Sequence, residues 1–247
     1  MNTRPGQSSL FYVGTYVADG SPSVFLYRLD GNSGKMERVD AFQGGRQPSF
    51  LAVHPGGLVL YAVNEHASGP GGTIRSFAIE PPTGRLTLLN EQPSHGAAPC
   101  HITTDRRGHF LLVANYTSGS VAVYPIEKDG RLATASDVVQ HRGSGPDPKR
   151  QAGPHAHAVN MDPANRFSLV CDLGLDKVLV YRLDLATGKL PLHSEALLHP
   201  GAGPRHLDFH PNGRTVYVIN ELDSTLTVFA WESETGALKE IQTLSAL

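Results

Sequence analysis

The sequence has few cysteines, few charged residues and no long apolar run. Its two cysteines, Cys100 and Cys171, cannot form a disulfide framework, so we expect free thiols in a reducing compartment, and the cytoplasm is the predicted location. Lysine and arginine total 21 against 23 aspartate and glutamate, a formal charge of -2 that leaves no basic patch for nucleic acid or an anionic membrane. No apolar run approaches the roughly 20 residues of a membrane span. Nucleic acid and membrane are therefore not expected partners, and the sequence carries no signal for an oligomeric state.

Glycine and proline are plentiful by contrast. The chain has 26 glycines and 18 prolines, with 40% hydrophobic and 18% charged residues. This balance is typical of a turn-rich domain with an all-β core.

A module of about fifty residues recurs along the chain. Each copy opens with a short strand-like segment that begins at a proline and ends at a turn, and one copy has alanine in place of the proline. These opening segments are Pro48–Pro55, Pro99–Asp105, Ala156–Pro163 and Pro204–Pro211. A repeat position that is uncharged in most copies and charged in one is therefore a candidate catalytic or binding position.

Each module predicts four antiparallel strands. The opening strand is followed by a tight turn, a nearly continuous apolar strand, an alternating strand, and a turn of small residues such as Thr83-Gly84 or Thr187-Gly188 that introduces the fourth. Four antiparallel strands repeated at this period indicate the blades of a β-propeller, and no Trp-Asp dipeptide closes them as in the WD40 type.

The copies predict a single propeller domain over residues 1–247. A partial first blade covers 8–46 and lacks its inner strand, and full blades begin near 47, 98, 155 and 203. About five blades are thus present. We interpret the chain as the N-terminal part of a longer protein, and a five-bladed ring with one incomplete blade is the alternative.

The start of each opening strand and the end of the next strand share one sheet edge, because antiparallel neighbours reverse direction. In a propeller this edge rings the mouth of the central channel, so we expect a polar funnel there. At the start of the opening strands stand Ser49, Cys100, His157 and Arg205. At the end of the second strands stand Glu65, Tyr116, Leu173 and Glu221. The residues just before this second set are Asn64, Asn115, Asp172 and Asn220.

Three of these residues deviate most from the repeat: His157, Arg205 and Glu221. An imidazole, a guanidinium and a carboxylate at one mouth suit carbonyl or carboxylate chemistry, since they offer proton transfer and charge stabilisation. The structural alternative is an ion pair between Arg205 and Glu221 that joins two strands of one blade, with His157 merely hydrogen-bonded.

Several runs resemble the propeller-type lactonase family, which includes bacterial 6-phosphogluconolactonases and is related to the fungal carboxy-muconate cyclase. The runs that carry the resemblance are Thr83–Leu86, Arg150–His157, Asp172–Val178, Gly203–His206 and Asn220–Leu222. The resemblance covers nearly the whole chain. It implies a seven-bladed fold, of which about two blades are not in this sequence.

The resemblance also implies a reaction and the residues that perform it. The reaction is hydrolysis of a sugar δ-lactone, with 6-phosphogluconolactone and hence the pentose phosphate pathway as the first expectation. His157, Arg205 and Glu221 fall on a proposed catalytic His, Arg and Glu, with His157 or Glu221 as the base and Arg205 at the developing negative charge. Arg150 is expected at the anionic end of the substrate. No cofactor is expected, and the remaining expected substrate-binding residues are Gln151, His155, Asn64, Glu65, Asn115, Asp172, His206 and Asn220.

Three other functions stay open on the sequence alone. One is the muconate cycloisomerase reaction with the same three residues. Another is a metal-dependent lactonase with a hard cation on Glu65, Asn115, Asp172 and Asn220; zinc on His155 and His157 has no third ligand in register. A third is a non-catalytic interaction scaffold with an exposed apolar patch.

Other notable residues suit structural roles. His54, His210, Asp105 and Asp162 occupy the first turn of their blades, where we expect them to cap turn backbone. Trp231 and Tyr181 lie on third strands and are expected to pack between blades. Cys100 has no base at a matching neighbour position, which argues against a nucleophilic thiol. Ser49 lacks a visible His and Asp arrangement.

Overall fold

A computed structural model describes residues 8–17, 20–66 and 71–247. All regular elements in these ranges are strands, and none of them is a helix that could cross a membrane. The predicted all-β class is therefore confirmed.

The strands form five antiparallel sheets, which we call sheets 1 to 5 in chain order. Sheet 1 has the order β1-β2-β3 and each later sheet has four strands that follow the chain order from one edge to the other. The strand bounds are as follows: sheet 1, β1 Ser9–Gly14, β2 Val24–Leu29, β3 Met36–Phe42; sheet 2, β4 Leu51–Val53, β5 Val59–Asn64, β6 Thr73–Glu80, β7 Arg85–Pro93; sheet 3, β8 Pro99–Thr104, β9 Phe110–Asn115, β10 Ser120–Pro125, β11 Asp137–Gln140; sheet 4, β12 Ala156–Met161, β13 Phe167–Asp172, β14 Lys177–Arg182, β15 Leu192–Leu197; sheet 5, β16 Pro204–Phe209, β17 Thr215–Asn220, β18 Thr225–Glu232, β19 Ala237–Ser245.

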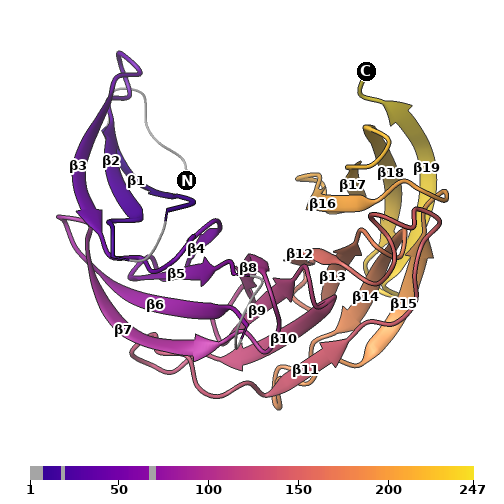
Figure 1. The fold of residues 1–247 in the computed structure, drawn as a ribbon, viewed down its shortest axis with the longest axis horizontal. Coiled ribbons are helices and arrows are strands. Elements are labelled where there is room, and N and C mark those ends of the chain that lie inside the picture. Colours follow the sequence, from indigo (N-terminus) through magenta and orange to yellow (C-terminus); the bar gives the residue numbers. More distant parts are fainter. Residues whose placement is uncertain (1–7, 18–19, 67–70) are drawn as a thin grey trace.

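The five sheets follow one another round an open arc (Figure 1). The strands β4, β8, β12 and β16 line the inner side of the arc, and β7, β11, β15 and β19 lie on its outer side. Each sheet is thus a blade in the predicted sense, with its first strand toward a central axis.

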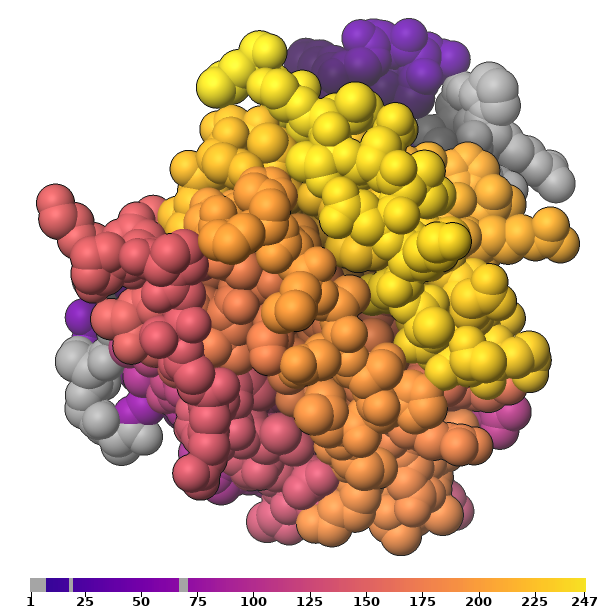
Figure 2. Space-filling model, turned by 90° about the vertical axis from the view of Figure 1, so that its right-hand side faces the viewer, coloured from indigo at the N-terminus to yellow at the C-terminus, as the bar shows by residue number. Residues whose placement is uncertain are grey.

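The hydrophobic core lies between neighbouring sheets. Four separate clusters of buried side chains fill the four interfaces, and Tyr181 and Trp231 belong to two of them, as expected. Because β9 and β13 have a sheet on both sides, every residue in them is buried. In β17 burial alternates, with Tyr217 and Ile219 on the open face. Figure 2 shows sheet 5 (yellow) lying against sheet 4 (orange) on the outside of the molecule.

The first turn of each blade is held by a polar side chain. The buried Asp105 carboxylate accepts from the backbone N–H groups of residues 107, 109 and 110, and Asp162 accepts from those of residues 164, 166 and 167. In the other two turns the Nδ1 atoms of His54 and His210 accept from a backbone N–H two residues on. These capping roles are confirmed.

A β-bulge interrupts the inner strands β8, β12 and β16 at the same place. The pairing with the next strand skips from Pro99 to His101, from Ala156 to Ala158 and from Pro204 to His206. The skipped residues are Cys100, His157 and Arg205. A bulge re-aims the extra side chain, because two residues then oppose a single partner residue.

Candidate active site

The bulged residues open into a pocket of about 380 Å³ at one mouth of the channel. Its walls are the starts of the inner strands and the ends of the second strands, which antiparallel pairing brings to one edge. The lining residues are Tyr16, Ser49, Phe50, Glu65, Cys100, Tyr116, Arg150, His157, Arg205, His206 and Glu221. His157, Arg205 and Glu221 therefore share one pocket.

Glu221 lies between two guanidinium groups. Arg205 donates from Nε to Glu221 Oε2 at 2.8 Å, and Arg150 donates from Nη2 to Glu221 Oε1. Partial burial opposes ionisation, but the hydrogen bonds from Arg150 and Arg205 lower the pKa of the Glu221 carboxyl on balance. The carboxylate is thus charged, has both oxygens engaged, and is a weak base.

His157 is only 8% exposed and remains neutral around pH 7. Burial is the main reason that its pKa falls from 6.5 to about 4, and the nearby charge of Arg205 lowers it further. Its carbonyl oxygen lies 3.3 Å from Cys100 Sγ, and its Nδ1 lies 3.9 Å from the same sulfur.

A layer of rings lies next to the pocket. The ring centroid of His206 is 5.1 Å from that of His157 and 5.3 Å from that of His101, and Phe50 packs on His101 at 4.1 Å. Burial lowers the pKa of His101 to about 3, with smaller effects from His206 and His157. Phe50, His157 and His206 of this layer line the pocket, and His101 packs against Phe50 and His206.

A model of the family described as "Lactonase, 7-bladed beta-propeller" matches residues 10–247. The chain belongs to this lactonase family. The expected seven-bladed class is thereby confirmed for the family.

The chain is similar to lactonases of several bacteria. It is 35% identical over 236 residues to the 6-phosphogluconolactonase of Bacillus subtilis, which covers 96% of this chain and 66% of that protein. It is 32% identical over 224 residues to the 6-phosphogluconolactonase of Formosa agariphila, covering 89% of this chain and 63% of that protein.

Solved structures give the same picture. The periplasmic gluconolactonase of Pseudomonas aeruginosa superimposes with a TM-score of 0.89 at 33% identity, covering 97% of this chain and 69% of that one. A Bacteroides fragilis structure provisionally named a 6-phosphogluconolactonase has a TM-score of 0.91 at 33% identity, covering 100% and 70%. The chain thus spans between 63% and 70% of the length of these relatives.

Four residues expected to bind substrate do not line this pocket. Asn64, Asn115, Asp172 and Asn220 are at most 2% exposed. Side chains alternate along a strand, so the residue before the pocket position points into the protein instead. Asn115 donates to the carbonyl oxygen of Ser94 in the preceding blade's exit loop at 3.0 Å, and Asn220 donates to the Thr225 hydroxyl at 2.8 Å. The expectation that this set of amides and one acid lines the funnel is wrong.

Asp172 forms a buried pair with a histidine that the sequence did not single out. Its Oδ2 lies 2.6 Å from His141 Nδ1, and its Oδ1 accepts from the backbone N–H of His155 at 2.8 Å. Its carboxylate therefore anchors the segment that leads to His157.

Gln151 and His155 also differ from expectation. Gln151 is completely buried and donates to Asp176 Oδ1 at 2.7 Å and to the carbonyl oxygen of Leu173 at 2.9 Å. His155 stacks on Tyr116 at 4.6 Å and is not among the residues that line the pocket. Both support the pocket from behind, because the long connection between β11 and β12 folds against sheet 4. Arg150, Glu65 and His206 do line the pocket.

Sequence reasoning placed Tyr116 and Cys100 at the funnel but assigned them no role in the chemistry, and it missed Tyr16. The Tyr116 hydroxyl lies 3.4 Å from Arg150 Nη2, and Tyr16 donates to Glu65 Oε2 at 2.9 Å. Tyr116 occupies the repeat position equivalent to Glu221, which was the available signal. The statement that Cys100 lacks a neighbouring base is wrong, since His157 lies beside it. Burial strongly raises the pKa of this thiol, so it is a poor nucleophile.

Most of the residues proposed as metal ligands are not available to a metal ion in the pocket. Asn115, Asp172 and Asn220 are each engaged inside the protein, and only Glu65 of the four lines the pocket. Across residues 8–17, 20–66 and 71–247, no three histidine, cysteine or acidic side chains are placed to share a metal ion.

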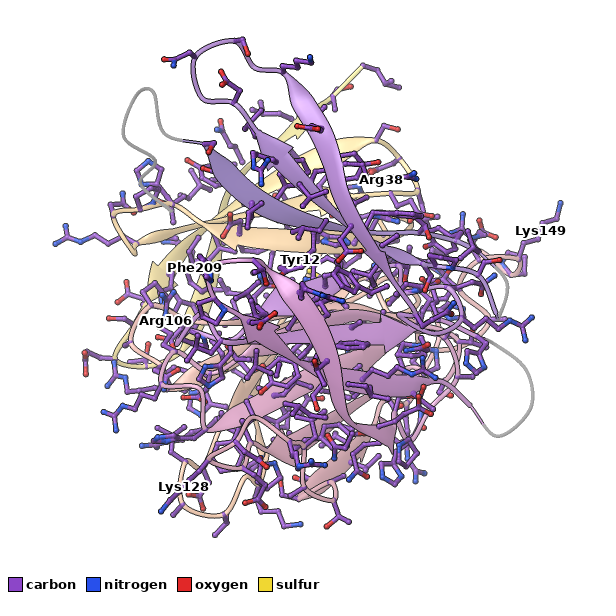
Figure 3. All side chains as sticks on the ribbon, turned by 90° about the vertical axis from the view of Figure 1, so that its left-hand side faces the viewer. Tyr12, Arg38, Arg106, Lys128, Lys149 and Phe209 are labelled. Atoms are coloured by element: carbon purple, nitrogen blue, oxygen red, sulfur yellow. The ribbon has the colours of Figure 1, made fainter. Side chains whose placement is uncertain are left out.

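A larger cavity of about 560 Å³ lies at the other end of the inner strands. Thr103, Asn160 and Asp208 contribute to it from three blades, together with Arg106 and Phe209. Figure 3 shows Arg106 and Phe209 on one side of the molecule and Lys149, the neighbour of Arg150, on the opposite side. The two cavities therefore open toward opposite faces of the propeller, and the groups that suit carbonyl chemistry lie in the smaller one.

Proposed function

We propose that the protein hydrolyses a sugar δ-lactone in the pocket formed by His157, Arg205 and Glu221. The observation that carries the proposal is that two β-bulges and one strand end direct a neutral imidazole, a guanidinium and a carboxylate into one pocket. The relatives named 6-phosphogluconolactonase and gluconolactonase support the same class of reaction. A small-molecule lactone is thus the partner, and 6-phosphogluconolactone is the first substrate to test.

His157 is the proposed general base. Glu221 is held by two guanidinium groups, whereas His157 is unprotonated near pH 7 and forms no ion pair with any residue that the structure describes. His157 takes a proton from water as the water oxygen bonds to the lactone carbonyl carbon. The proton affinity of the imidazole rises during this step, because the new oxyanion offsets the field of Arg205.

Arg205 is the proposed oxyanion stabiliser. Its Nε is committed to Glu221, which fixes the plane of the guanidinium and leaves its terminal N–H groups as donors toward the pocket. When the tetrahedral intermediate collapses, the bond from the carbonyl carbon to the ring oxygen breaks and His157 returns the proton to that oxygen. The product is the open hydroxy acid, and every role belongs to a side chain, so no cofactor is proposed.

Arg150 is the proposed contact for an anionic substituent. It reaches Glu221 and Tyr116 from the connection between β11 and β12, and its side chain is 44% exposed at the pocket edge. A phosphorylated lactone would place its phosphate there, since guanidinium groups suit phosphate oxygens. A cytoplasmic location is proposed with this substrate, although one relative is described as periplasmic.

A direct assay tests the proposal. The purified chain is mixed with glucono-δ-lactone or 6-phosphogluconolactone, and acid release is followed against the uncatalysed rate. We expect hydrolysis that His157→Gln reduces about 100- to 10,000-fold, the range for loss of a general base. His54→Gln, in a turn outside the pocket, is the matched control and keeps full activity. No hydrolysis of either lactone, or equal loss in both variants, would refute the proposal; loss of activity with a chelator would favour the metal-dependent alternative.

A further inference from the structure

Asp176 lies in the turn between β13 and β14, outside the pocket. The equivalent turn position is Gly119 in sheet 3 and Ser224 in sheet 5, and all three residues have positive φ angles between 53° and 58°. Aspartate in this left-handed region is strained relative to glycine. Only the sheet 4 copy among these three carries an acid, which points to a role for the carboxylate.

The Asp176 carboxylate accepts three hydrogen bonds inside the protein. Gln151 Nε2 donates to it at 2.7 Å, and the backbone N–H groups of Gly201 and Gly203 donate at 2.7 and 2.8 Å. Asp176 is 5% exposed and Gln151 is completely buried. The carboxylate therefore ties two segments that are about fifty residues apart in sequence to a single turn of sheet 4.

The first segment carries Arg150. Gln151 Oε1 accepts from the backbone N–H of Asp147 at 3.1 Å, and the Asp147 carboxylate accepts from the backbone N–H of Arg150 at 3.2 Å. The side chain of Gln151 thus fixes the small loop from which Arg150 extends to Glu221.

The second segment carries Arg205 and supports Glu221. Arg205 follows Gly203 by two residues, and the carbonyl oxygen of Gly203 accepts from the backbone N–H of Glu221 at 2.8 Å. Gly203 itself has no room for a side chain, since an added Cβ would lie 2.4 Å from Leu222 Cγ. The two hydrogen bonds from Gly201 and Gly203 to Asp176 therefore fix the backbone that positions Arg205 and Glu221.

We propose that Asp176 is a positioning residue that holds Arg150, Arg205 and Glu221 in one arrangement for the substrate. The inference rests on the proposed function for its kinetic consequence. Asp176 touches neither the pocket nor the substrate, and it acts through Gln151 on one side and through residues 201–203 on the other. A misplacement of such groups by about 1 Å can cost on the order of 100-fold in rate.

The kinetic test is a double-mutant cycle between Asp176→Asn and Glu221→Gln. Asp176→Asn keeps the size of the side chain but replaces one acceptor oxygen with a donor that faces backbone N–H groups. We expect it to reduce kcat/KM about 10- to 100-fold in the wild-type background. The loss should fall to less than about three-fold in the Glu221→Gln background, because the two guanidiniums no longer share an anchor.

Asp162→Asn is the matched control. Asp162 is also buried in sheet 4 and also accepts three hydrogen bonds, all of them from backbone N–H groups. It lies at the opposite end of the sheet from the pocket. Asp162→Asn should lower the free energy of unfolding without changing kcat/KM, and it should show no coupling to Glu221→Gln. Equal losses for Asp176→Asn with and without Glu221, or a kinetic effect of Asp162→Asn of the same size, would overturn the proposal.

A second measurement does not depend on lactone hydrolysis. The ¹H–¹⁵N resonance of Arg205 Nε, which donates to Glu221, should exchange slowly with solvent in the wild type and in Asp162→Asn. It should exchange rapidly in Asp176→Asn, because Arg205 loses its fixed position. If wild-type protein hydrolyses neither lactone but this resonance behaves as expected, the function fails and the positioning role stands. An unchanged resonance in Asp176→Asn refutes the positioning role.

Discussion

Replacing Arg205 should reduce catalysis much more than it reduces stability. The guanidinium pairs with Glu221 at 2.8 Å, but the two side chains remain 46% and 29% exposed. Solvent screens such a pair, so Arg205→Ala should lower the free energy of unfolding by less than about 1 kcal/mol. Removing an oxyanion stabiliser costs about 100- to 1000-fold in kcat, or about 2.7 to 4 kcal/mol of transition-state energy. The loss of activity should therefore far exceed the loss of stability.

The same substitution should move the acid limb of the pH profile. Burial and the charge of Arg205 both lower the pKa of His157. Arg205→Ala removes that charge but leaves burial, the larger cause, and the influence of His206, so the pKa of His157 should rise above about 4 and stay below 6.5. Arg205→Lys keeps the charge but loses the planar fork, so it should retain the low acid limb and still lose rate.

The assay is initial-rate lactone hydrolysis from about pH 3 to pH 8, with urea unfolding in parallel. Arg85→Ala is the control, because Arg85 forms an exposed pair with Asp40 at 3.9 Å on the outer part of its blade. If Arg205→Ala retains activity within about three-fold of wild type, Arg205 does not stabilise the oxyanion.

Three further predictions follow from the buried imidazoles and turn carboxylates. In the wild type, kcat/KM should stay level down to about pH 5 and fall about tenfold per pH unit once His157 protonates below about 4; a limb near pH 6.5 would contradict the neutral-base role. His101 has a pKa of about 3 in the folded protein against an ordinary value of 6.5, so protonation favours the unfolded chain. The free energy of unfolding should therefore be highest above pH 6.5 and should decrease as the pH falls toward 3. His101→Phe, which copies Phe50 from the preceding blade, should therefore flatten the decline of the urea midpoint between pH 6.5 and pH 4, and an unchanged decline would exclude His101 as its source. Asp105→Asn should cost about 1 to 3 kcal/mol by urea unfolding with activity unchanged, since a buried acceptor of three backbone hydrogen bonds is weakened; a loss below about 0.5 kcal/mol would show that the cap matters little.

Much of the fold could be predicted because each copy of the repeat has the same pattern of strands and turns. The apolar runs, the turn residues and the small-residue turns recur at one spacing, and each copy confirms the others. The capping by Asp105 and Asp162 follows from local turn chemistry, which depends on residues a few positions apart. His157, Arg205 and Glu221 could be selected for a similar reason, since they deviate from otherwise uniform repeat positions.

The candidate site was predicted less completely than the fold. Asn115, Asp172 and Asn220 stand next to pocket positions in sequence, yet alternation along the strand turns them into the protein. The connection between β11 and β12 has no counterpart in the other modules, so its pattern could not show that Arg150 reaches a residue 71 positions away while its neighbour Gln151 is buried. Tyr116 differs from Glu221 in type, and only their shared place in the repeat linked them.

The amino-acid sequence alone determined the strands, their order and the blade that each residue belongs to, because these depend on short-range periodicity and on turn chemistry. Tertiary structure decided which side chains meet. The bulges at Cys100, His157 and Arg205 aim three side chains at the pocket, and hydrogen bonds from Asp172 and Asp176 fix the segments behind it. These contacts join residues far apart in the chain, so their energy exists only after the sheets have packed around the common axis.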